Sequence, residues 1–296
     1  MNKSPISSNS ASSVLSLLFK RMSIITVMAW LLLFACIPLI ITIVMSFLAH
    51  DNQQLIQPIL TLENYRQLFH DLFFHIFLHS LWVSTWVTII SLLLAYPAAY
   101  IISQCSDKIK SLLMILMIVP FWTSSLIRTY GIMALIKAKG VLSSVLLTLG
   151  LIDQPLQLLY TNSAVYIGMI YSLLPFMVLP LFSSFDRLDK TLIDAARDLG
   201  ASRLRILFRV IVPLSYPGIM AGVLFVFLPA MTLFYIPELL GGAKGMLLGN
   251  LVENQFLQML DWPGGAATSM MLTLFLIILL IIYRWRMKKV RVQELL

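Results

Sequence analysis

Few side chains in this sequence have the types and spacing that catalysis or metal binding requires. Two of the four histidines, His75 and His79, have the i, i+4 spacing with which one helix face can bind a metal. No third ligand is spaced to complete such a site, so we expect neutral histidines near a membrane interface and no metal. The two cysteines, Cys36 and Cys105, lie in or beside apolar runs and predict no disulfide framework.

The densest group of charges lies in residues 186–213, between two apolar runs of membrane length. The segment has no nucleophile–base pair and no Gly-rich phosphate loop, so it resembles a docking element more than an enzyme site. Asp189 is placed to cap the N-terminus of a short helix, and Gly200 to end it in the left-handed conformation. A second short helix is expected to begin at Arg203. An apolar stripe at helical spacing marks one face of the first helix: Leu192, Ile193, Ala196 and Leu199.

The composition places most of the chain in lipid. Of 296 residues, 59% are hydrophobic and 11% are charged, and the mean hydropathy is +0.91. Because this small number of charges cannot cover a water-facing surface, we predict an all-α, polytopic membrane protein. Each expected span is close to the length that crosses the hydrocarbon core as a helix. The six expected spans are residues 24–48, 78–103, 111–135, 164–185, 210–235 and 267–283.

The positive charges predict the orientation. Lys and Arg are concentrated in both tails and in the loops after the second and fourth spans, which the positive-inside rule places in the cytoplasm. The net charge of +8 then needs no nucleic-acid partner. We expect a disordered cytoplasmic tail (1–22), a permease domain (23–285) and a second cytoplasmic tail (286–296). The short apolar stretch 141–151 is expected to be re-entrant, interfacial or external.

Composition alone leaves open whether segment 186–213 docks on a protein or lies on anionic lipid. Its spacing resembles the EAA loop of ABC importer permeases, in which Glu-Ala-Ala and a glycine precede Ile-x-Leu-Pro. Here Asp194 replaces the glutamate, Gly200 and Pro213 keep their places, and Val210 and Val212 replace the aliphatic pair. The resemblance implies a type I, MetI-like importer fold with six transmembrane helices. It also implies that this loop sits in a cleft of a cytoplasmic ATPase subunit. The coupling residues that it implies are Asp194, Ala195, Ala196, Asp198, Gly200, Arg203 and Pro213.

Four further segments are similar to permeases of polyamine importers: residues 120–131, 174–181, 241–244 and 261–267. Together they resemble the B-type permease subunit of spermidine/putrescine systems, over roughly residues 24–290. A polycation needs carboxylates and aromatic faces along its path, and a cation–π contact contributes about 0.5–2 kcal/mol. Glu238 is the strongest candidate because a carboxylate near the hydrocarbon boundary is costly without a partner, which here could also be Lys244 or Arg128. The candidate path residues are Phe121, Trp122, Tyr130, Phe234, Tyr235, Glu238, Asp261 and Trp262.

The resemblance implies a non-catalytic permease of the bacterial inner membrane, working by alternating access. The expected partners are an ATPase dimer, a C-type second permease, a periplasmic polyamine-binding protein and membrane lipid. The chain has no Walker motif, so ATP and Mg are expected to be bound by the ATPase and no cofactor by this chain. The alternatives are an importer permease for another solute (an opine, thiamine or an inorganic ion) and an ion-coupled secondary transporter. A secondary transporter would need mid-span carboxylates, and a membrane enzyme a convergent polar site.

Overall fold

The computed structural model describes residues 8–51, 55–242 and 245–293. The chain is 79% helical, which confirms the all-α expectation. It divides into two compact units, Met1–Gln67 with Asp261–Met271, and Leu68–Leu260 with Leu272–Leu296. Residues 1–7 of the expected N-terminal tail, and Ala243 and Lys244, lie outside the described residues.

The first unit begins with one long helix. It consists of α1 (Ser8–Leu31), a π-helical turn η1 (Leu32–Cys36) and α2 (Ile37–Ser46). The part long and apolar enough to span a membrane is Phe19–Ser46, close to the first expected span. Helix α1 starts at Ser8, well before the expected end of the tail at residue 22. Once a helix is nucleated, propagation into a polar flank costs little, which accounts for the earlier start.

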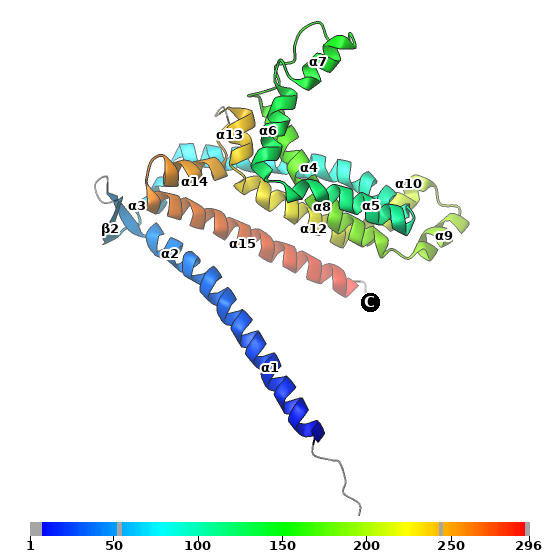
Figure 1. The fold of residues 1–296 in the computed structure, drawn as a ribbon, viewed down its shortest axis with the longest axis horizontal. Helices are drawn as coiled ribbons and strands as arrows, with labels where there is room; N and C mark the ends of the chain where they lie inside the picture. Colours follow the sequence, from blue (N-terminus) through cyan, green and yellow to red (C-terminus); the bar gives the residue numbers. More distant parts are fainter. Residues whose placement is uncertain (1–7, 52–54, 243–244, 294–296) are drawn as a thin grey trace, which may run out of the picture. The chain divides into compact units, whose positions relative to one another are not determined.

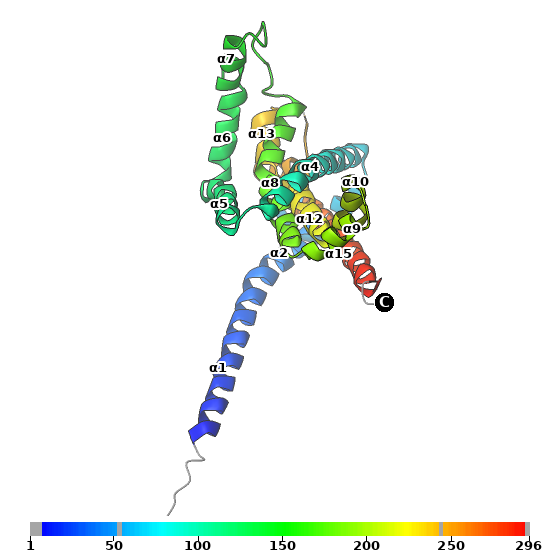
Figure 2. The same ribbon diagram turned by 90° about the vertical axis from the view of Figure 1, so that its right-hand side faces the viewer.

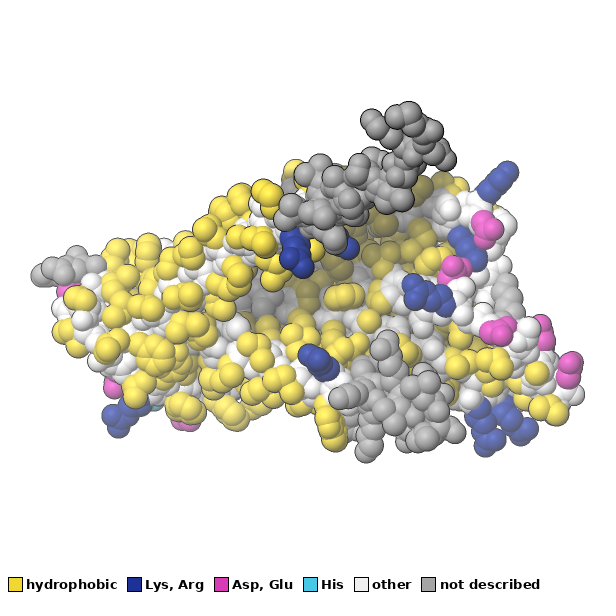
Figure 3. All heavy atoms as spheres, turned by 90° about the horizontal axis from the view of Figure 1, so that it is seen from below, with side chains coloured by type: hydrophobic (Ala, Val, Ile, Leu, Met, Phe, Trp, Pro, Cys, Tyr) yellow, Lys and Arg dark blue, Asp and Glu magenta, His cyan; other side chains and the backbone are white. Residues whose placement is uncertain are grey.

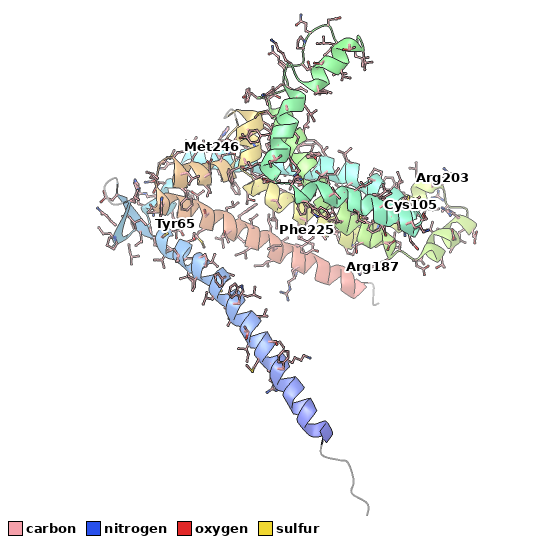
Figure 4. All side chains as sticks on the ribbon, viewed as in Figure 1. Tyr65, Cys105, Arg187, Arg203, Phe225 and Met246 are labelled. Atoms are coloured by element: carbon pink, nitrogen blue, oxygen red, sulfur yellow. The ribbon has the colours of Figure 1, made fainter. Side chains whose placement is uncertain are left out.

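A small hairpin follows this helix and was not expected from the sequence. Strand β1 (Leu48–Asp51) pairs antiparallel with β2 (Leu55–Leu60), and α3 (Glu63–Gln67) comes next. The Asn64 side-chain amide donates to the carbonyl oxygens of Ser46 (3.0 Å) and Leu48 (2.8 Å). The Ser46 hydroxyl also lies 2.7 Å from the hydroxyl of Tyr65, a residue labelled in Figure 4. These bonds satisfy carbonyls freed where the first span ends.

The second unit is built on three helices that lie side by side: α4 (Asp71–Gln104), α8 (Asn162–Asp186) and α12 (Tyr216–Thr232) (Figures 1 and 2). Helix α12 approaches α8 closely through glycine. A Cβ atom added at Gly218 would lie 2.5 Å from the Ser184 Cβ and 2.8 Å from the Pro180 carbonyl oxygen. A larger residue there would push the two helices apart.

The third expected span, 111–135, is wrong as a single helix. Helix α5 (Asp107–Ile118) ends in a 3-10 turn, η2 (Val119–Trp122), and α6 (Ser125–Ile136) starts after an extended Thr123. Pro120 lies at the start of the turn and lacks the N–H that a continuous helix needs. With α7 (Val141–Thr148), α6 forms the membrane-length element Ser125–Thr148, which runs away from the three-helix bundle in Figure 1.

The fifth span is bent. Helix α9 (Lys190–Asp198) precedes α10 (Arg203–Ile206), the π-helical η3 (Leu207–Ile211) and α11 (Val212–Leu214). This last stretch meets α12 at 67°, and the bent pair brings the candidate spans from five to six. Two short helices, α13 (Tyr235–Gly241) and α14 (Leu248–Leu257), precede the final helix α15 (Trp262–Gln293).

The surface agrees with a membrane environment. Figure 3 shows a face covered mostly by hydrophobic side chains, with charged side chains gathered toward the end where α9 and α10 lie. Exposed apolar side chains occur along every long helix. In water such a surface would be an aggregation liability, whereas lipid tails solvate it.

Candidate functional site

The loop between α8 and α12 has the helix that its sequence predicts. The Asp189 carboxylate accepts a hydrogen bond from the Thr191 backbone N–H at 2.9 Å and caps α9. Hydrogen bonds from the Thr191 side chain and backbone hold the pKa of Asp189 below its ordinary value. The carboxylate therefore stays ionised as a cap at neutral pH, where its charge also suits the helix N-terminus.

Gly200 ends α9 in the left-handed conformation, as predicted. Its φ is +75°, and its N–H donates to the Arg197 carbonyl at 2.8 Å. The Ala201 N–H donates to the Ala196 carbonyl at 3.1 Å, which completes a Schellman motif. The turn directs the chain into α10, whose N-terminus Ser202 caps by accepting from the Arg205 N–H at 3.4 Å.

The expected apolar stripe of α9 does not form a single buried face. Ile193 is buried, and Ala196 packs against the same core. Leu192 and Leu199 point outward instead, and Leu199 is 89% exposed. Leu192 and Leu199 lie on one edge of the stripe, roughly 100° or more around the helix from Ile193, and this edge faces away from the core.

The exposed part of this loop forms a mixed apolar and basic surface. Leu199, Leu204 and Phe208 are exposed on it. Figure 4 places Arg187 and Arg203 at the same end of the bundle. The other predicted coupling residues that lie exposed are Asp194, Ala195, Asp198, Gly200 and Pro213.

Two ion pairs lie at this end. The guanidinium of Arg197 lies 2.9 Å from Asp194 on one face of α9, and both side chains are well exposed, so the pair adds little stability. The Lys110 ammonium lies 2.7 Å from Asp186 and joins the start of α5 to the end of α8. The hydrogen bond that the Lys110 ammonium donates to Asp186 is the main cause that raises the pKa of Lys110.

A cavity of about 180 Å³ lies at the opposite end of the bundle, near α13 and α14. Glu238 lines it from α13, and Glu253 faces it from α14. Met246, labelled in Figure 4, lies in the segment between these two helices. The remaining lining residues are uncharged: Pro237, Gly245, Met246, Asn250, Asn254 and Gln258.

Glu253 is the residue that the sequence reasoning missed. Burial raises the pKa of its carboxyl above the ordinary value, and the nearby charge of Glu238 raises it further. Its helix carries polar side chains at Asn250, Glu253 and Asn254, the i, i+3, i+4 pattern of one helix face. This pattern could have indicated a polar helix face, although the helix is too short to be a membrane span.

The break before α13 fixes the position of the cavity. The chain leaves α12 at Leu233, which is extended, and Pro237 lies in the first turn of α13. The freed carbonyl of Phe234 accepts hydrogen bonds from the Asn250 side chain (2.8 Å) and the Glu238 N–H (3.2 Å). Asn250 therefore ties α14 to the break that positions Glu238.

The predicted aromatic residues do not gather around Glu238 in one cluster. Phe121 packs edge-on against Phe176 with centroids 5.4 Å apart, and the Arg128 guanidinium lies 4.3 Å from the Phe121 ring centroid. Trp122 and Tyr130, by contrast, are 82% and 54% exposed. Phe234 and Tyr235 pack edge-on at 5.9 Å where α12 gives way to α13.

The sequence offered two possible ion-pair partners for Glu238, Arg128 and Lys244. Within the described part of the chain no ion pair joins Glu238 to Arg128, whose guanidinium stacks on Phe121 instead. The other partner considered, Lys244, lies outside the described residues.

Asp261 and Trp262 belong to the first unit. The Asp261 carboxylate accepts from the Gly264 N–H at 3.0 Å at the start of α15 and lies 3.5 Å from His50 Nδ1. Asp261 therefore has a local helix-capping role, and Trp262 begins the helix that it caps. Among the described residues, no three His, Cys, Asp or Glu side chains gather as metal ligands.

Comparisons with known proteins identify the family. Residues 91–292 match the family model described as a binding-protein-dependent transport system inner membrane component. The chain is 48% identical to the spermidine/putrescine transport system permease protein PotB of Escherichia coli, over 89% of this chain and 95% of that protein. It is 42% identical to PotB of Haemophilus influenzae, over 90% of this chain and 93% of that one.

Solved structures agree at the level of the fold. A chain from the crystal structure of a bacterial alginate ABC transporter, in complex with an alginate pentasaccharide-bound periplasmic protein, has a TM-score of 0.73. The match covers 92% of this chain and 94% of that chain at 14% identity. The resemblance drawn from the loop and from the four further segments is confirmed. The chain is a multi-pass inner-membrane permease that belongs to the binding-protein-dependent transport system inner membrane component family, and within that family to the PotB permeases.

Proposed function

We propose that this chain is the permease subunit through which polyamines cross the inner membrane of an ATP-driven importer. The observation that carries the substrate class is its 48% identity, over nearly its whole length, to PotB permeases of spermidine/putrescine systems. The cavity with two carboxylates and three amide side chains supports it, because ammonium groups are bound by carboxylates and carbonyl oxygens.

The chain needs partners to act. It works with two ATPase copies that bind ATP and Mg, a second C-type permease and a periplasmic polyamine-binding protein, and it catalyses no reaction itself. Both termini and the loop containing α9 face the cytoplasm. The cavity then faces the periplasmic side, since it lies at the opposite end of the bundle (Figure 1).

The geometry suggests how transport proceeds. The loaded binding protein docks outside, and ATP binding closes the ATPase dimer around the exposed residues of α9 and the turn at Gly200. Because Ile193 of α9 belongs to the same apolar core as Ile211 of η3, movement of α9 is passed to η3 and so to the bent fifth span. Alternating access then moves the polyamine from the acidic cavity to the cytoplasm.

The substrate class is tested by competition. The complete transporter is reconstituted in proteoliposomes, and uptake of radiolabelled spermidine is measured with excess unlabelled putrescine, thiamine, an opine or phosphate. We expect spermidine and putrescine alone to compete. Competition by thiamine, the opine or phosphate, with no effect of putrescine, would replace the polyamine assignment.

Uptake is expected to weaken at acidic pH because of Glu253. Its raised pKa means that this carboxyl loses its charge, as pH falls, sooner than an ordinary glutamate with a pKa of about 4.3. Polyamines keep their charges there, so the half-saturating concentration should rise as pH falls through the raised pKa. Glu253→Gln should flatten this dependence, measured with the same binding protein. A pH profile identical in both proteins would remove Glu253 from the path.

A further inference from the structure

At the bend between α11 and α12, two hydroxyl groups form a part-buried hydrogen-bonded pair. The Ser215 side chain is fully buried, and its hydroxyl donates to the Val212 carbonyl at 3.1 Å. The Tyr96 hydroxyl of α4 lies 3.1 Å from the Ser215 oxygen. Either of the two hydroxyls can be the donor in this second bond. Pro217 lacks an N–H, so the bend leaves the carbonyls here short of backbone donors.

The ring of Tyr96 contacts the other end of the same loop. It packs edge-on against Phe185 with ring centroids 5.0 Å apart. Phe185 is buried one residue before the end of α8, and its carbonyl accepts from the Leu188 N–H at 3.1 Å. Tyr96 thus contacts both sides of segment 186–213, at Phe185 directly before it and at Ser215 two residues after it.

The middle of the loop is packed less tightly against α4. A cavity of about 570 Å³ separates them, lined on the α4 side by Tyr96, Pro97 and Tyr100. From the loop, apolar residues of α9, α10 and η3 line it, including Ile193, Ile206 and Leu207. The cavity opens to the surface, where the exposed residues Arg197, Arg203 and Leu204 also line it, so the loop has room to shift there while its ends stay fixed.

The geometry points to Tyr96 as a positioning residue for energy coupling. Tyr96 contacts both Phe185 and Ser215 and so holds the two ends of the loop together. A displacement of α9 then changes the bend of the fifth span. Without this link, α9 could move into the cavity and leave the bend unchanged. This inference rests on the proposed function and adds a residue outside the loop to the coupling machinery. The hydrogen bond between Tyr96 and Ser215 is therefore the interaction that the test variants should remove.

Tyr96→Phe removes the hydroxyl and keeps the ring against Phe185. In the reconstituted transporter we expect ATP hydrolysis to continue while polyamine imported per ATP falls roughly two- to tenfold, the effect of one lost hydrogen bond. Ser215→Ala should act in the same direction, and the double variant should be no worse than the more severe single one.

Tyr100→Phe is the matched control. Tyr100 packs edge-on against the same Phe185 at 5.5 Å, and in the described part of the chain its hydroxyl has no hydrogen-bond partner. Its import per ATP should stay at the wild-type value. Equal losses in the Tyr96→Phe and Tyr100→Phe transporters would overturn the inference, as would an unchanged ratio in both Tyr96→Phe and Ser215→Ala.

A measurement without cargo separates this inference from the polyamine assignment. Hydrogen–deuterium exchange of residues 207–219 is followed with and without MgATP. The wild-type and Tyr100→Phe transporters should show an ATP-dependent change that Tyr96→Phe reduces severalfold. The same change in all three would contradict the role of Tyr96. Failure of wild-type protein to import any polyamine would instead contradict the proposed substrate.

Discussion

Gly200→Leu is expected to abolish most ATP-driven uptake while the transporter still assembles. The glycine has a φ of +75°, where a leucine costs about 1–2 kcal/mol, enough to change the population of the turn about tenfold. Nothing lies within 4 Å of an added Cβ, so the change creates no clash inside the chain. The loss should come from the turn after α9 and from the exposed surface of α9 that we propose meets the ATPase. Uptake and ATP hydrolysis are measured together in proteoliposomes.

Gly150 provides a matched control for this prediction. It ends α7 with a φ of +67°, and its Schellman hydrogen bonds run from Gly150 to Leu147 and from Leu151 to Leu146, both at 3.0 Å. It also has open space around it, so Gly150→Leu carries the same backbone cost away from the coupling loop. We expect it to keep uptake. Gly200→Asn should keep most uptake as well, because asparagine tolerates this conformation. Full uptake by Gly200→Leu would remove the turn from the coupling mechanism.

The second large effect is expected at the acidic cavity. Glu238→Gln and Glu253→Gln each remove one carboxylate and leave an amide of similar shape. A hydrogen bond to a charged group contributes about 1.5–3 kcal/mol, so each change should raise the half-saturating polyamine concentration roughly tenfold or more. The double variant should lose more than the product of the single effects, because Glu238→Gln alone removes the charge that raises the pKa of Glu253 and so leaves the remaining carboxylate more fully ionised.

Glu63→Gln is the control for this experiment. Glu63 lies in the first turn of α3 and is exposed outside the cavity. Its replacement removes one charge from the transporter, so it reports the long-range effect of net charge alone. A half-saturating concentration that shifts equally in all three single variants would assign the effect to long-range charge and not to the cavity.

The local features of the coupling loop could be predicted because they depend on neighbouring residues. A cap at Asp189 and a left-handed glycine at Gly200 need only their own helix, and both are present. The spans likewise follow from hydropathy, which responds to composition over about 20 residues. Hydropathy continues unchanged across Pro120 and so does not mark the end of the helix there, although a proline within a span suggests a kink because its missing N–H interrupts the helix.

The acidic cavity could be predicted only in part because it depends on tertiary structure. Glu238 is conspicuous beside a span, whereas Glu253 lies in a short polar helix that hydropathy does not single out. The two meet only because the chain breaks at Leu233 and Asn250 bonds to the Phe234 carbonyl. The outward position of Leu199 also depends on tertiary structure. The apolar stripe of a helix can be identified from the sequence, but the part of it that neighbouring helices cover cannot.

ATP-driven polyamine uptake with and without this chain tests the central claim most directly. Proteoliposomes are prepared with the ATPase, the second permease, this chain and the binding protein, and in parallel with this chain omitted. Radiolabelled spermidine and ATP consumption are followed together. We predict uptake that requires ATP, the binding protein and this chain. Equal uptake in the vesicles that lack the chain, or uptake in the complete vesicles that is independent of ATP, would contradict its role as the permease of an ATP-driven polyamine importer.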